Sequence, residues 1–321
     1  MATATASVIV STRNRAQLLR GCLESLLAER PAIAWEVIVV DNASTDETAA
    51  TVERCRELAG GVRFEYLVEE RLGLSHARNR GVADARGEYL LFTDDDVLVQ
   101  PGWVDALCAG FAQDDVAAVA GCVRPEWPSP PPRWLAGRHA GVLALTDFGD
   151  DARDLTEDEV PVGANMAIRA SALGGSAQPF DPRLGHQGST YFAYEEFELF
   201  GELRAGGGRF AYRPDAVVRH RILPERMTWE GMRRASIHNG FGSRRAERLG
   251  GAAPIALRIS VPSLVRTYLS ASRHRRQNGG RDEVEPQAAW EELRRYWDLG
   301  RWIEVLFGGS RLGGWLIGRL A

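Results

Sequence analysis

Short apolar runs alternate with stretches of helical periodicity in the first part of the chain. The apolar runs predict strands at residues 7–11, 35–40, 64–68, 88–93 and 116–121. Apolar residues at helical spacing predict helices at 18–27, from about 47, at 75–85 and at 103–111. This alternation is typical of an α/β fold with a mainly parallel sheet, right-handed crossovers and flanking helices.

The pattern changes after residue 121. The later segments are predicted as follows: a proline-rich loop at 125–132, an acidic surface loop at 147–158, an ordered segment at 162–169, a helix at 195–205, and strands at 209–212 and 217–220. Helical patterns then follow at 227–248, 255–276, 288–306 and 310–320. We therefore expect an α/β domain over residues 1–222 and a helical C-terminal region over residues 223–321.

Composition narrows the class of protein. The 321 residues are 45% hydrophobic and 26% charged, which is enough to bury a full core. The formal net charge of -4 gives no electrostatic footprint for nucleic acid, so no nucleic-acid partner is expected. The four cysteines lack metal-binding spacing and are expected to be reduced and buried. The chain shows no signal-peptide pattern and no long apolar span, so the expected location is the cytoplasm.

Three consecutive carboxylates, Asp94, Asp95 and Asp96, follow directly after the apolar run at 88–93. Carboxylates at the end of a buried strand repel one another unless a cation or water compensates them. In open α/β sheets, ligands bind at the carboxyl ends of strands. A hard divalent cation held by oxygen ligands, and through it a phosphate, would fit this triplet. An Asp-rich turn is the alternative interpretation.

Two other predicted strands end in polar side chains. Ser11 closes the first strand and Asp41 follows the second, so three strand ends are expected to converge on one pocket. The Asp41 carboxylate can accept an N–H from uracil, thymine or guanine, although a turn cap is the alternative role. Arg78 lies near the start of a predicted helix, which is a favourable place for anionic oxygen.

A second acidic cluster begins the helix predicted at 195–205. At helical spacing, Glu196 shares a face with the apolar side chains of this helix, whereas Glu195 lies on the face of Glu198. Burial on the apolar face raises the pKa of a carboxyl group and allows it to act as a general base. The alternative is that these acids favour the helix dipole, which explains Glu195 better than Glu196.

Taken together, these segments resemble the family 2 glycosyltransferases of GT-A fold, a Rossmann-like fold of nucleotide-diphospho-sugar transferases. The matching pieces occur in family order over about residues 7–222: VIVSTRNR, VIVVDNASTDET, GLSHARNRG, GEYLLFTDDD, VGANMAIRAS, FDPRLG, EEFEL and VRH. The resemblance implies a nucleotide-sugar half at about 1–100, an acceptor half at about 101–222, a divalent cation (Mn²⁺ or Mg²⁺) and inversion at the anomeric carbon.

The resemblance also implies roles on the donor side. Ser11, Arg13 and Asp41 would hold the nucleoside, and Arg78 would approach the diphosphate. UDP is the favoured nucleotide, and dTDP and GDP are also compatible with Asp41. The family often has an aromatic residue where Arg13 stands, so stacking on the base would come from the guanidinium plane of Arg13.

Further roles concern the metal and the sugar. Asp94 and Asp96 match the DxD motif of the family, Asp96 would ligate the metal, and His220 would add a ligand. Asp95 would lie nearer the sugar or the ribose.

The acceptor or sugar side would be lined by four residues: Gly163, Ala164, Asn165 and Glu195. Glu196 matches the catalytic base of the family. The usual Glu-Asp pair is Glu195-Glu196 here, so the choice of base between these two residues is open.

Alternatives follow from what the chain lacks. The absence of the QxxRW motif favours addition of a single sugar to a saccharide, a lipid-linked or a small natural-product acceptor. A sugar-phosphate nucleotidyltransferase is disfavoured because the loop at 11–14 has no glycine, and a non-catalytic carbohydrate- or nucleotide-binding protein would leave Glu196 unexplained. For the C-terminal helices, packing against the main domain is favoured over peripheral contact with a membrane. A homodimer is also compatible with the sequence.

Overall fold

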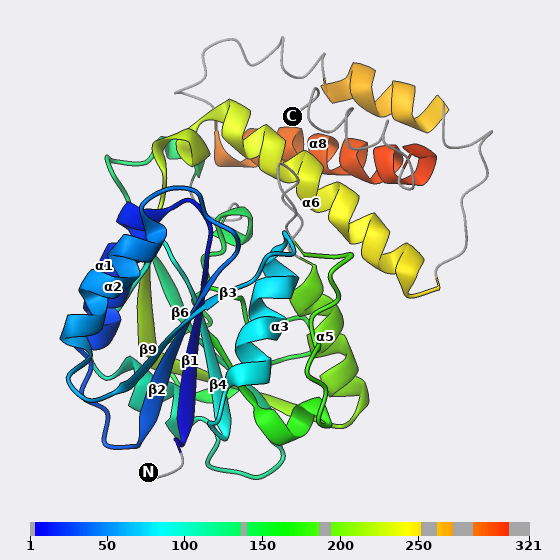
Figure 1. Cartoon of the computed structure of the whole chain (residues 1–321). Helices are drawn as coiled ribbons and strands as arrows, with labels where there is room; N and C mark the ends of the chain where they lie inside the picture. The colour runs from blue at the N-terminus through cyan, green and yellow to red at the C-terminus, as the bar shows by residue number, and fades with distance from the viewer. Residues whose placement is uncertain (1–3, 136–139, 186–193, 252–261, 272–284, 308–321) are drawn as a thin grey trace. The chain divides into compact units, whose positions relative to one another are not determined.

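A computed structural model describes residues 4–135, 140–185, 194–251, 262–271 and 285–307 (Figure 1). Two compact units are present. The first contains Met1–Glu126, Ala144–Pro182 and Glu195–Arg221, and the second contains Trp127–Leu143, Arg183–Tyr194 and Ile222–Ala321. The resemblance implied an acceptor half at about 101–222, and the second unit takes its Trp127–Leu143 segment from within this range.

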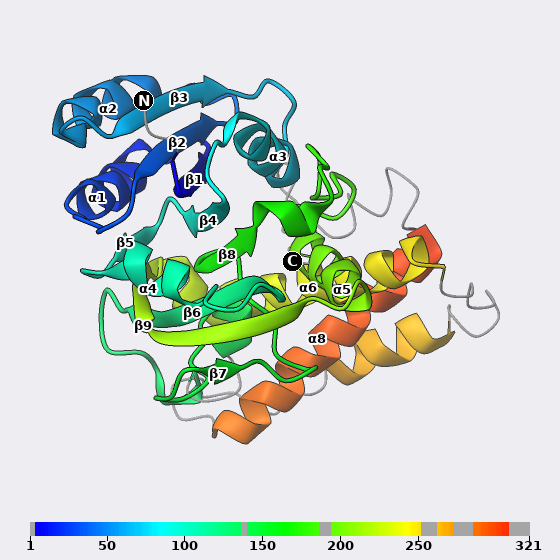
Figure 2. The same cartoon turned by 90° about the horizontal axis from the view of Figure 1, so that it is seen from below.

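The first unit is built around a nine-stranded sheet with the order β3-β2-β1-β4-β8-β6-β9-β5, and β7 pairs with β9 (Figure 2). The strands are β1 (Ala6–Thr12), β2 (Trp35–Asp41), β3 (Arg63–Val68), β4 (Tyr89–Asp94), β5 (Val97–Val99), β6 (Val116–Glu126), β7 (Arg153–Asp154), β8 (Met166–Arg169) and β9 (Arg209–Arg221). Strands β3, β2, β1 and β4 are mutually parallel, whereas β8 runs antiparallel to both β4 and β6. The predicted α/β class with a mainly parallel sheet is confirmed.

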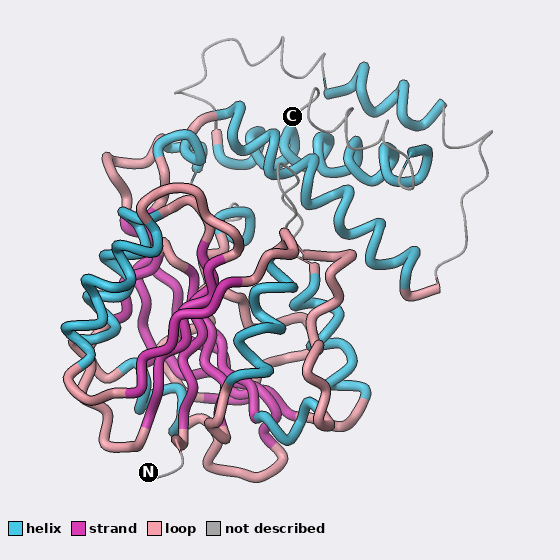
Figure 3. Tube along the Cα trace, viewed as in Figure 1, coloured by secondary structure: helices cyan, strands magenta, loops and turns pink. Residues whose placement is uncertain are grey.

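Helices cover both faces of this sheet (Figures 1 and 3). They are α1 (Ala16–Leu27), α2 (Thr48–Arg56), α3 (Leu74–Asp84), α4 (Trp103–Ala109) and α5 (Glu195–Ala205), with 3-10 turns η1 (Glu57–Ala59) and η4 (Ala170–Leu173). Successive strand residues point to opposite faces, so Val8 packs in the cluster with α1, α2 and α4, whereas Ile9 packs in the cluster with α5. This two-sided burial explains why the strands read as continuous apolar runs.

The parallel register brings three strand ends to one edge. Thr12 of β1 lies opposite Asp41 of β2, and Ser11 of β1 lies opposite Asp94 of β4. The carboxyl ends of β1, β2 and β4 therefore meet, and we call this the carboxyl edge. It is the edge at which open α/β sheets bind ligands.

Several boundaries differ from the predicted ones. The strands predicted at 209–212 and 217–220 form one strand, β9. Its pairing with β6 shifts register between Gly121 and Cys122, so residues 214–216 have no partners on β6. This irregularity explains why the sequence pattern showed two strands. Strand β6 also continues to Glu126, into the predicted proline-rich loop, and only Met166–Arg169 of the segment at 162–169 is a strand.

The second unit is helical. Its elements are η2 (Arg133–Leu135), η3 (Ala140–Leu143), η5 (Pro224–Met227), α6 (Trp229–Leu249), a helix at 262–271 and α8 (Pro286–Phe307). Helices α6 and α8 match the patterns at 227–248 and 288–306. The rest of the pattern at 255–276 and the whole of that at 310–320 lie outside the described residues. None of the helices in the described ranges is long and apolar enough to cross a membrane.

Candidate active site

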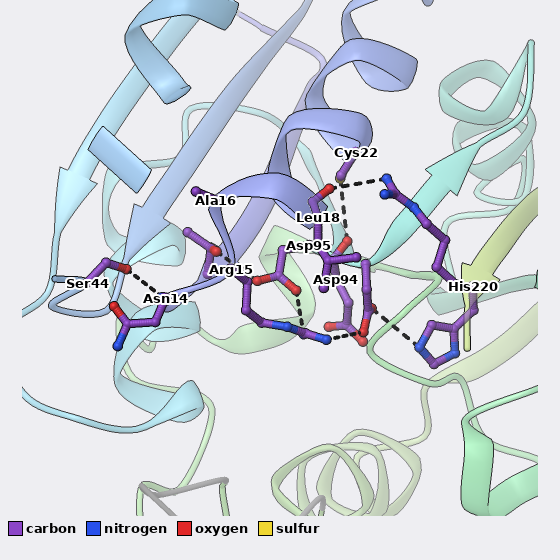
Figure 4. Close-up of polar contacts among 12 residues, drawn as sticks. Asn14, Arg15, Ala16, Leu18, Cys22, Ser44, Asp94, Asp95 and His220 are labelled. Carbon is purple, nitrogen blue, oxygen red and sulfur yellow. Dashed lines mark hydrogen bonds and ion pairs between the residues drawn. The ribbon is translucent and has the colours of Figure 1, made fainter. Parts of the chain in front are cut away.

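Asp94 is the last residue of β4, and Asp95 and Asp96 form the tight turn between β4 and β5, on the carboxyl edge (Figure 4). The Asp94 side chain is 34% exposed, whereas those of Asp95 and Asp96 are 4% and 6% exposed. Two adjacent buried carboxylates cannot both stay ionised without compensation. The structure supplies this compensation from the loop after β1.

Arg15 bridges the two buried carboxylates. Its Nη1 donates to Asp95 Oδ1 at 2.6 Å and its Nη2 donates to Asp96 Oδ2 at 2.7 Å (Figure 4). Thr12 Oγ1 donates to the other Asp95 oxygen at 2.7 Å. Burial raises the pKa of Asp95 to about 7, although the Arg15 charge acts in the opposite direction. Arg15 was not among the site residues predicted from the sequence. The signal that could have identified it is its position in the loop that follows β1, at the same edge as the triplet.

His220 reaches the triplet from β9, because Val97 of β5 pairs with His220. Its Nε2 lies 3.4 Å from Asp96 Oδ1 (Figure 4). Burial acts to raise the pKa of Asp96, but His220 and Arg15 outweigh it, and the pKa lies below the ordinary value. Asp96 is therefore ionised over the physiological range.

The donor atoms at Asp96 and His220 fit a divalent cation. Oδ1 of Asp96 is buried, faces the imidazole and accepts no hydrogen bond within the described part of the chain. Carboxylate and imidazole suit Mn²⁺, and Mg²⁺ takes one or two carboxylates plus substrate phosphates rather than an all-protein cage. The described residues contain no group of three or more His, Cys, Asp and Glu side chains arranged for a metal ion. Asp96 and His220 are the pair of candidate ligands whose atoms face each other in this part of the chain.

Asp41 caps a turn at the neighbouring strand end. Its Oδ1 accepts from the Ser44 backbone N–H at 2.8 Å, and its Oδ2 accepts from the Tyr66 hydroxyl at 2.6 Å. Each carboxylate oxygen has a second lone pair, so Asp41 can still accept from a ligand. Close by in the sequence, Ser11 Oγ and Arg13 Nε are buried and have no hydrogen-bond partner among the described residues.

The loops after β1 and β2 are tied together at Asn14, which has a left-handed φ of 52°. The Asn14 backbone N–H donates to Ser44 Oγ at 2.9 Å (Figure 4). Asn14 Oδ1 accepts from the Thr45 backbone N–H at 2.7 Å. These contacts fix the loop that carries Arg13 and Arg15. The nucleoside residues predicted from the sequence and the acidic triplet therefore share one rigid edge.

A second cluster forms around Arg78 of α3. Arg78 Nη1 lies 2.8 Å from both Glu195 Oε1 and Glu196 Oε1 of α5, and Arg78 Nη2 lies 3.6 Å from Asp94 Oδ1. The Gly163 backbone N–H donates to Glu196 Oε2 at 2.9 Å. Five of the residues that the sequence singled out, from four segments of the chain, are thus brought together.

Both glutamates have perturbed acidity. Burial raises the pKa of Glu195 to about 8 against the opposing charge of Arg78, and the carboxylate of Glu196 adds to the rise. Burial also raises the pKa of Glu196, and the positive charge of Arg78 offsets part of this rise. The side chain of Glu195 is fully buried, whereas that of Glu196 is 10% exposed. Of the two carboxyl groups, that of Glu196 is therefore the more accessible.

The predicted acceptor-side residues divide between site and core. Gly163 contacts the Arg78 cluster, and the Ala164 carbonyl accepts from Thr93 Oγ1 at 3.0 Å. Asn165 is fully buried, and its Nδ2 donates to the carbonyls of Cys122 and Ala216. Its Oδ1 accepts from Trp103 Nε1, so the Asn165 amide links strands within the core and does not face the cluster.

Comparison with known proteins bears on this arrangement. Residues 7–174 match the model of the family described as Glycosyl transferase family 2. Succinoglycan biosynthesis protein ExoM of Rhizobium meliloti is 27% identical over 241 residues, which cover 74% of this chain and 72% of ExoM. Glucosyl-dolichyl phosphate glucuronosyltransferase of Haloferax volcanii is 23% identical over 249 residues, which cover 74% of this chain and 76% of that relative.

A solved structure shares the fold. The mannosyltransferase PcManGT from Pyrobaculum calidifontis, in complex with GDP-Man and Mn²⁺, superposes with a TM-score of 0.66 at 19% sequence identity. The alignment covers 97% of this chain and 89% of PcManGT. The fold is therefore GT-A, as the resemblance implied. Because the family model matches more than half of the residues, the chain belongs to glycosyl transferase family 2 and is a glycosyltransferase.

Proposed function

We propose that the protein is a metal-dependent, inverting glycosyltransferase that moves one sugar from a nucleoside-diphosphate sugar, with UDP as the favoured nucleotide, to an acceptor hydroxyl. The observation that carries the proposal is the convergence of acids on the carboxyl edge. Asp41, the triplet at 94–96 and Glu196 of α5 come from distant parts of the chain and are either buried or held by fixed contacts. A buried acidic cluster of this kind costs stability and marks a functional site.

The donor would bind along this edge. Ser11 Oγ and Arg13 Nε are buried polar atoms without partners among the described residues, and such atoms are usually satisfied by a ligand or water. Asp41 keeps spare lone pairs for an N–H of the base. Uracil, thymine and guanine all present such a donor, so the base is set by contacts beyond Asp41.

Asp96 and His220 would hold the divalent cation, with Asp94 as a third candidate ligand on the exposed side of the triplet. When bound, Mn²⁺ or Mg²⁺ offsets the negative charge that develops on the departing diphosphate. Arg15 keeps the second oxygen of Asp96 occupied, so Asp96 presents one oxygen to the ion site. That PcManGT was crystallised with Mn²⁺ supports this proposal for the chain.

Glu196 would be the catalytic base. Its carboxylate takes the proton of the acceptor hydroxyl while that oxygen forms a bond to the anomeric carbon, and the bond from this carbon to the diphosphate oxygen breaks on the opposite face. Glu196 is favoured over Glu195 because the Glu195 side chain is fully buried. A lipid-linked acceptor is supported by the Haloferax volcanii relative, a glucosyl-dolichyl phosphate glucuronosyltransferase.

The proposal is tested with a panel of UDP-, dTDP- and GDP-sugars in the presence of Mn²⁺. We expect one donor to raise the melting temperature and to be hydrolysed slowly, with release of nucleoside diphosphate. Glu196→Gln should lower this hydrolysis by about 10²–10⁴-fold without weakening donor binding. Asp96→Ala should abolish the Mn²⁺-dependent part of the stabilisation.

Two results would contradict the proposal. Full hydrolysis by Glu196→Gln would reject the assigned base, and stabilisation by no donor in the panel would reject the nucleotide-sugar site. In a parallel assay that supplies a nucleoside triphosphate and a sugar 1-phosphate, release of pyrophosphate would indicate a sugar-phosphate nucleotidyltransferase. Donor binding without any turnover would indicate a binding protein.

A further inference from the structure

The contacts of Arg78 do not match those expected of a diphosphate ligand. Its side chain is 4% exposed, and one terminal nitrogen lies 2.8 Å from oxygens of both Glu195 and Glu196. The other terminal nitrogen faces Asp94 at 3.6 Å. The guanidinium also lies over the Phe180 ring, 5.5 Å from its centroid. An arginine enclosed in this way cannot reach a ligand without breaking these contacts.

Gly163 provides the space for this arrangement. A Cβ atom at position 163 would lie 2.0 Å from Arg78 Nη2 and 2.1 Å from Glu196 Oε1, which is closer than real Cβ contacts allow. The same residue donates its backbone N–H to Glu196 Oε2. Gly163 therefore both makes room for the Arg78–Glu196 pair and holds one oxygen of that pair.

We infer that Arg78 is a positioning residue for the Glu196 carboxylate and not a ligand of the donor diphosphate. The inference rests on the proposed function, because it presupposes that Glu196 is the base. Arg78 binds one oxygen of Glu196 and Gly163 binds the other, so the carboxylate has a single orientation. Fixed orientation of a reacting group is worth large factors in rate.

Glu195 is the second carboxyl group in contact with Arg78, and burial raises its pKa. It shares Arg78 Nη1 with Glu196, but its pKa of about 8 keeps it largely protonated near neutral pH. Arg78 Nη1 contacts both glutamates, and Asp94 faces Arg78 Nη2 at longer range. Glu195 thus acts as a hydrogen-bond acceptor for Arg78.

The charged groups around Glu196 give the inference a pH signature. Arg78 lowers the pKa of Glu196, whereas Asp94 raises it, and Glu195 is the remaining titratable neighbour. A base is active when deprotonated, so activity falls as the pH drops through the pKa of Glu196. Loss of the Arg78 charge lets this pKa rise, which moves the acid limb of the profile to higher pH.

The test compares Arg78→Met with Arg80→Met, an exposed arginine two residues further along α3. The readouts are the dissociation constant of UDP with Mn²⁺, measured by calorimetry, and the pH profile of nucleoside-diphosphate release from the donor that the panel identifies. We expect Arg78→Met to bind UDP as the wild type does, to lose about 10²-fold in kcat and to shift the acid limb upward. Arg78→Lys should recover part of kcat, and Arg80→Met should leave every readout unchanged.

Weaker UDP binding by Arg78→Met with an unchanged kcat would overturn the inference and indicate that Arg78 binds the donor diphosphate. If Arg78→Met does not fold, Gly163→Ala provides a second test. This variant keeps Arg78 and Glu196 but displaces their side chains, because the added Cβ would collide with both. It should lower kcat while UDP binding stays unchanged, and the reverse pattern would overturn the inference. Glu196→Gln is measured in parallel: wild-type activity there would reject the proposed function itself, whereas an inactive Glu196→Gln beside a fully active Arg78→Met would reject only the positioning role.

Discussion

At the scale of single residues, the first unit concentrates negative charge at one edge and compensates it with few cations. Arg15 forms ion pairs with Asp95 and Asp96, and Arg78 forms ion pairs with Glu195 and Glu196. One guanidinium for each pair of carboxylates is not full compensation. The remaining charge is relieved by protonation, and Glu195 is the clearest case because it is fully buried.

Glu195 should therefore couple stability to pH. Its pKa is raised from 4.5 to about 8 in the folded protein, so between these values the folded state keeps a proton that the unfolded state releases. The free energy of unfolding then falls as the pH rises through this range, with the full contribution present at lower pH. The Glu195→Gln side chain cannot ionise. We therefore expect the free energy of unfolding of this variant to depend less steeply on pH in this range.

Urea unfolding followed by circular dichroism between about pH 5 and pH 8 measures the slope. The matched control is Glu202→Gln, which changes an exposed glutamate of the same helix and should keep the wild-type slope. A Glu195→Gln variant whose stability falls with pH as steeply as that of the wild type would show that Glu195 does not hold the proton.

Sequence patterns located the acids of the site better than their partners. Asp94 to Asp96 and Glu196 stand out because carboxylates directly beside apolar runs are unusual, and this contrast is visible in one dimension. Arg15 does not stand out, because its contact with the triplet depends on the left-handed turn at Asn14. The core role of Asn165 likewise depends on three partners that are distant in the sequence.

At the scale of elements, the parallel half of the sheet was predictable and its antiparallel additions were less so. Strands β1, β2 and β4 are dominated by apolar runs, and β3 begins with alternating charged and aromatic residues, so their type follows from the sequence pattern. Strands β5 and β7 have three and two residues, which is too short for any periodicity. Strand β9 contains Pro214, which reads as a break in sequence but lies where the register shift leaves β9 unpaired.

In the second unit, helices α6 and α8 cross at two glycines. A Cβ at Gly240 would lie 1.8 Å from the Trp297 carbonyl oxygen, and one at Gly300 would lie 1.9 Å from the Ile237 carbonyl oxygen. Both obstacles are backbone atoms, which cannot rotate away as side chains do. The close approach of the two helices therefore requires glycine at positions 240 and 300.

Gly240→Ala should destabilise the protein by about 1–3 kcal/mol, the usual cost of overpacking a tight contact. Gly201→Ala is the control, since this exposed glycine of α5 has no atom within 4 Å of the added Cβ. It should stabilise by about 0.5–1 kcal/mol because alanine favours the helix. Thermal and urea unfolding measure whether Gly240→Ala lowers and Gly201→Ala raises the free energy of unfolding. Equal changes in the two variants would contradict the close crossing of α6 and α8.

At the scale of the whole molecule, charge is divided unevenly along the chain. Residues 1–222 carry 22 arginines and 33 acidic residues, whereas residues 223–321 carry 17 arginines and 10 acidic residues. The overall net charge of -4 conceals this division, which is why composition alone did not indicate it. A region with excess positive charge is attracted to anionic surfaces.

An exposed apolar stripe lies within the basic region. Val265, Tyr268 and Leu269 of the helix at 262–271 are 51%, 48% and 56% exposed and follow helical spacing. Leu264 and Ala271 of the same helix pack into the cluster with α6 and α8, so the stripe is the outward face. Apolar side chains on a positively charged, helical region are typical of helices that lie on membrane surfaces.

We expect the protein to co-sediment with vesicles that contain anionic lipid and not with vesicles of neutral lipid, and added salt should weaken the binding because it screens the arginines. A triple variant, Val265→Ser, Tyr268→Ser and Leu269→Ser, should lose the binding. The matched control replaces Leu58, Val68 and Leu72 of the first unit, which are 51%, 52% and 46% exposed, and should keep it. If the stripe variant instead changes the mass in sedimentation equilibrium and leaves vesicle binding intact, the stripe joins two copies of the chain. A membrane role would place a lipid-linked acceptor and the enzyme on the same surface, so this outcome also bears on the choice of acceptor.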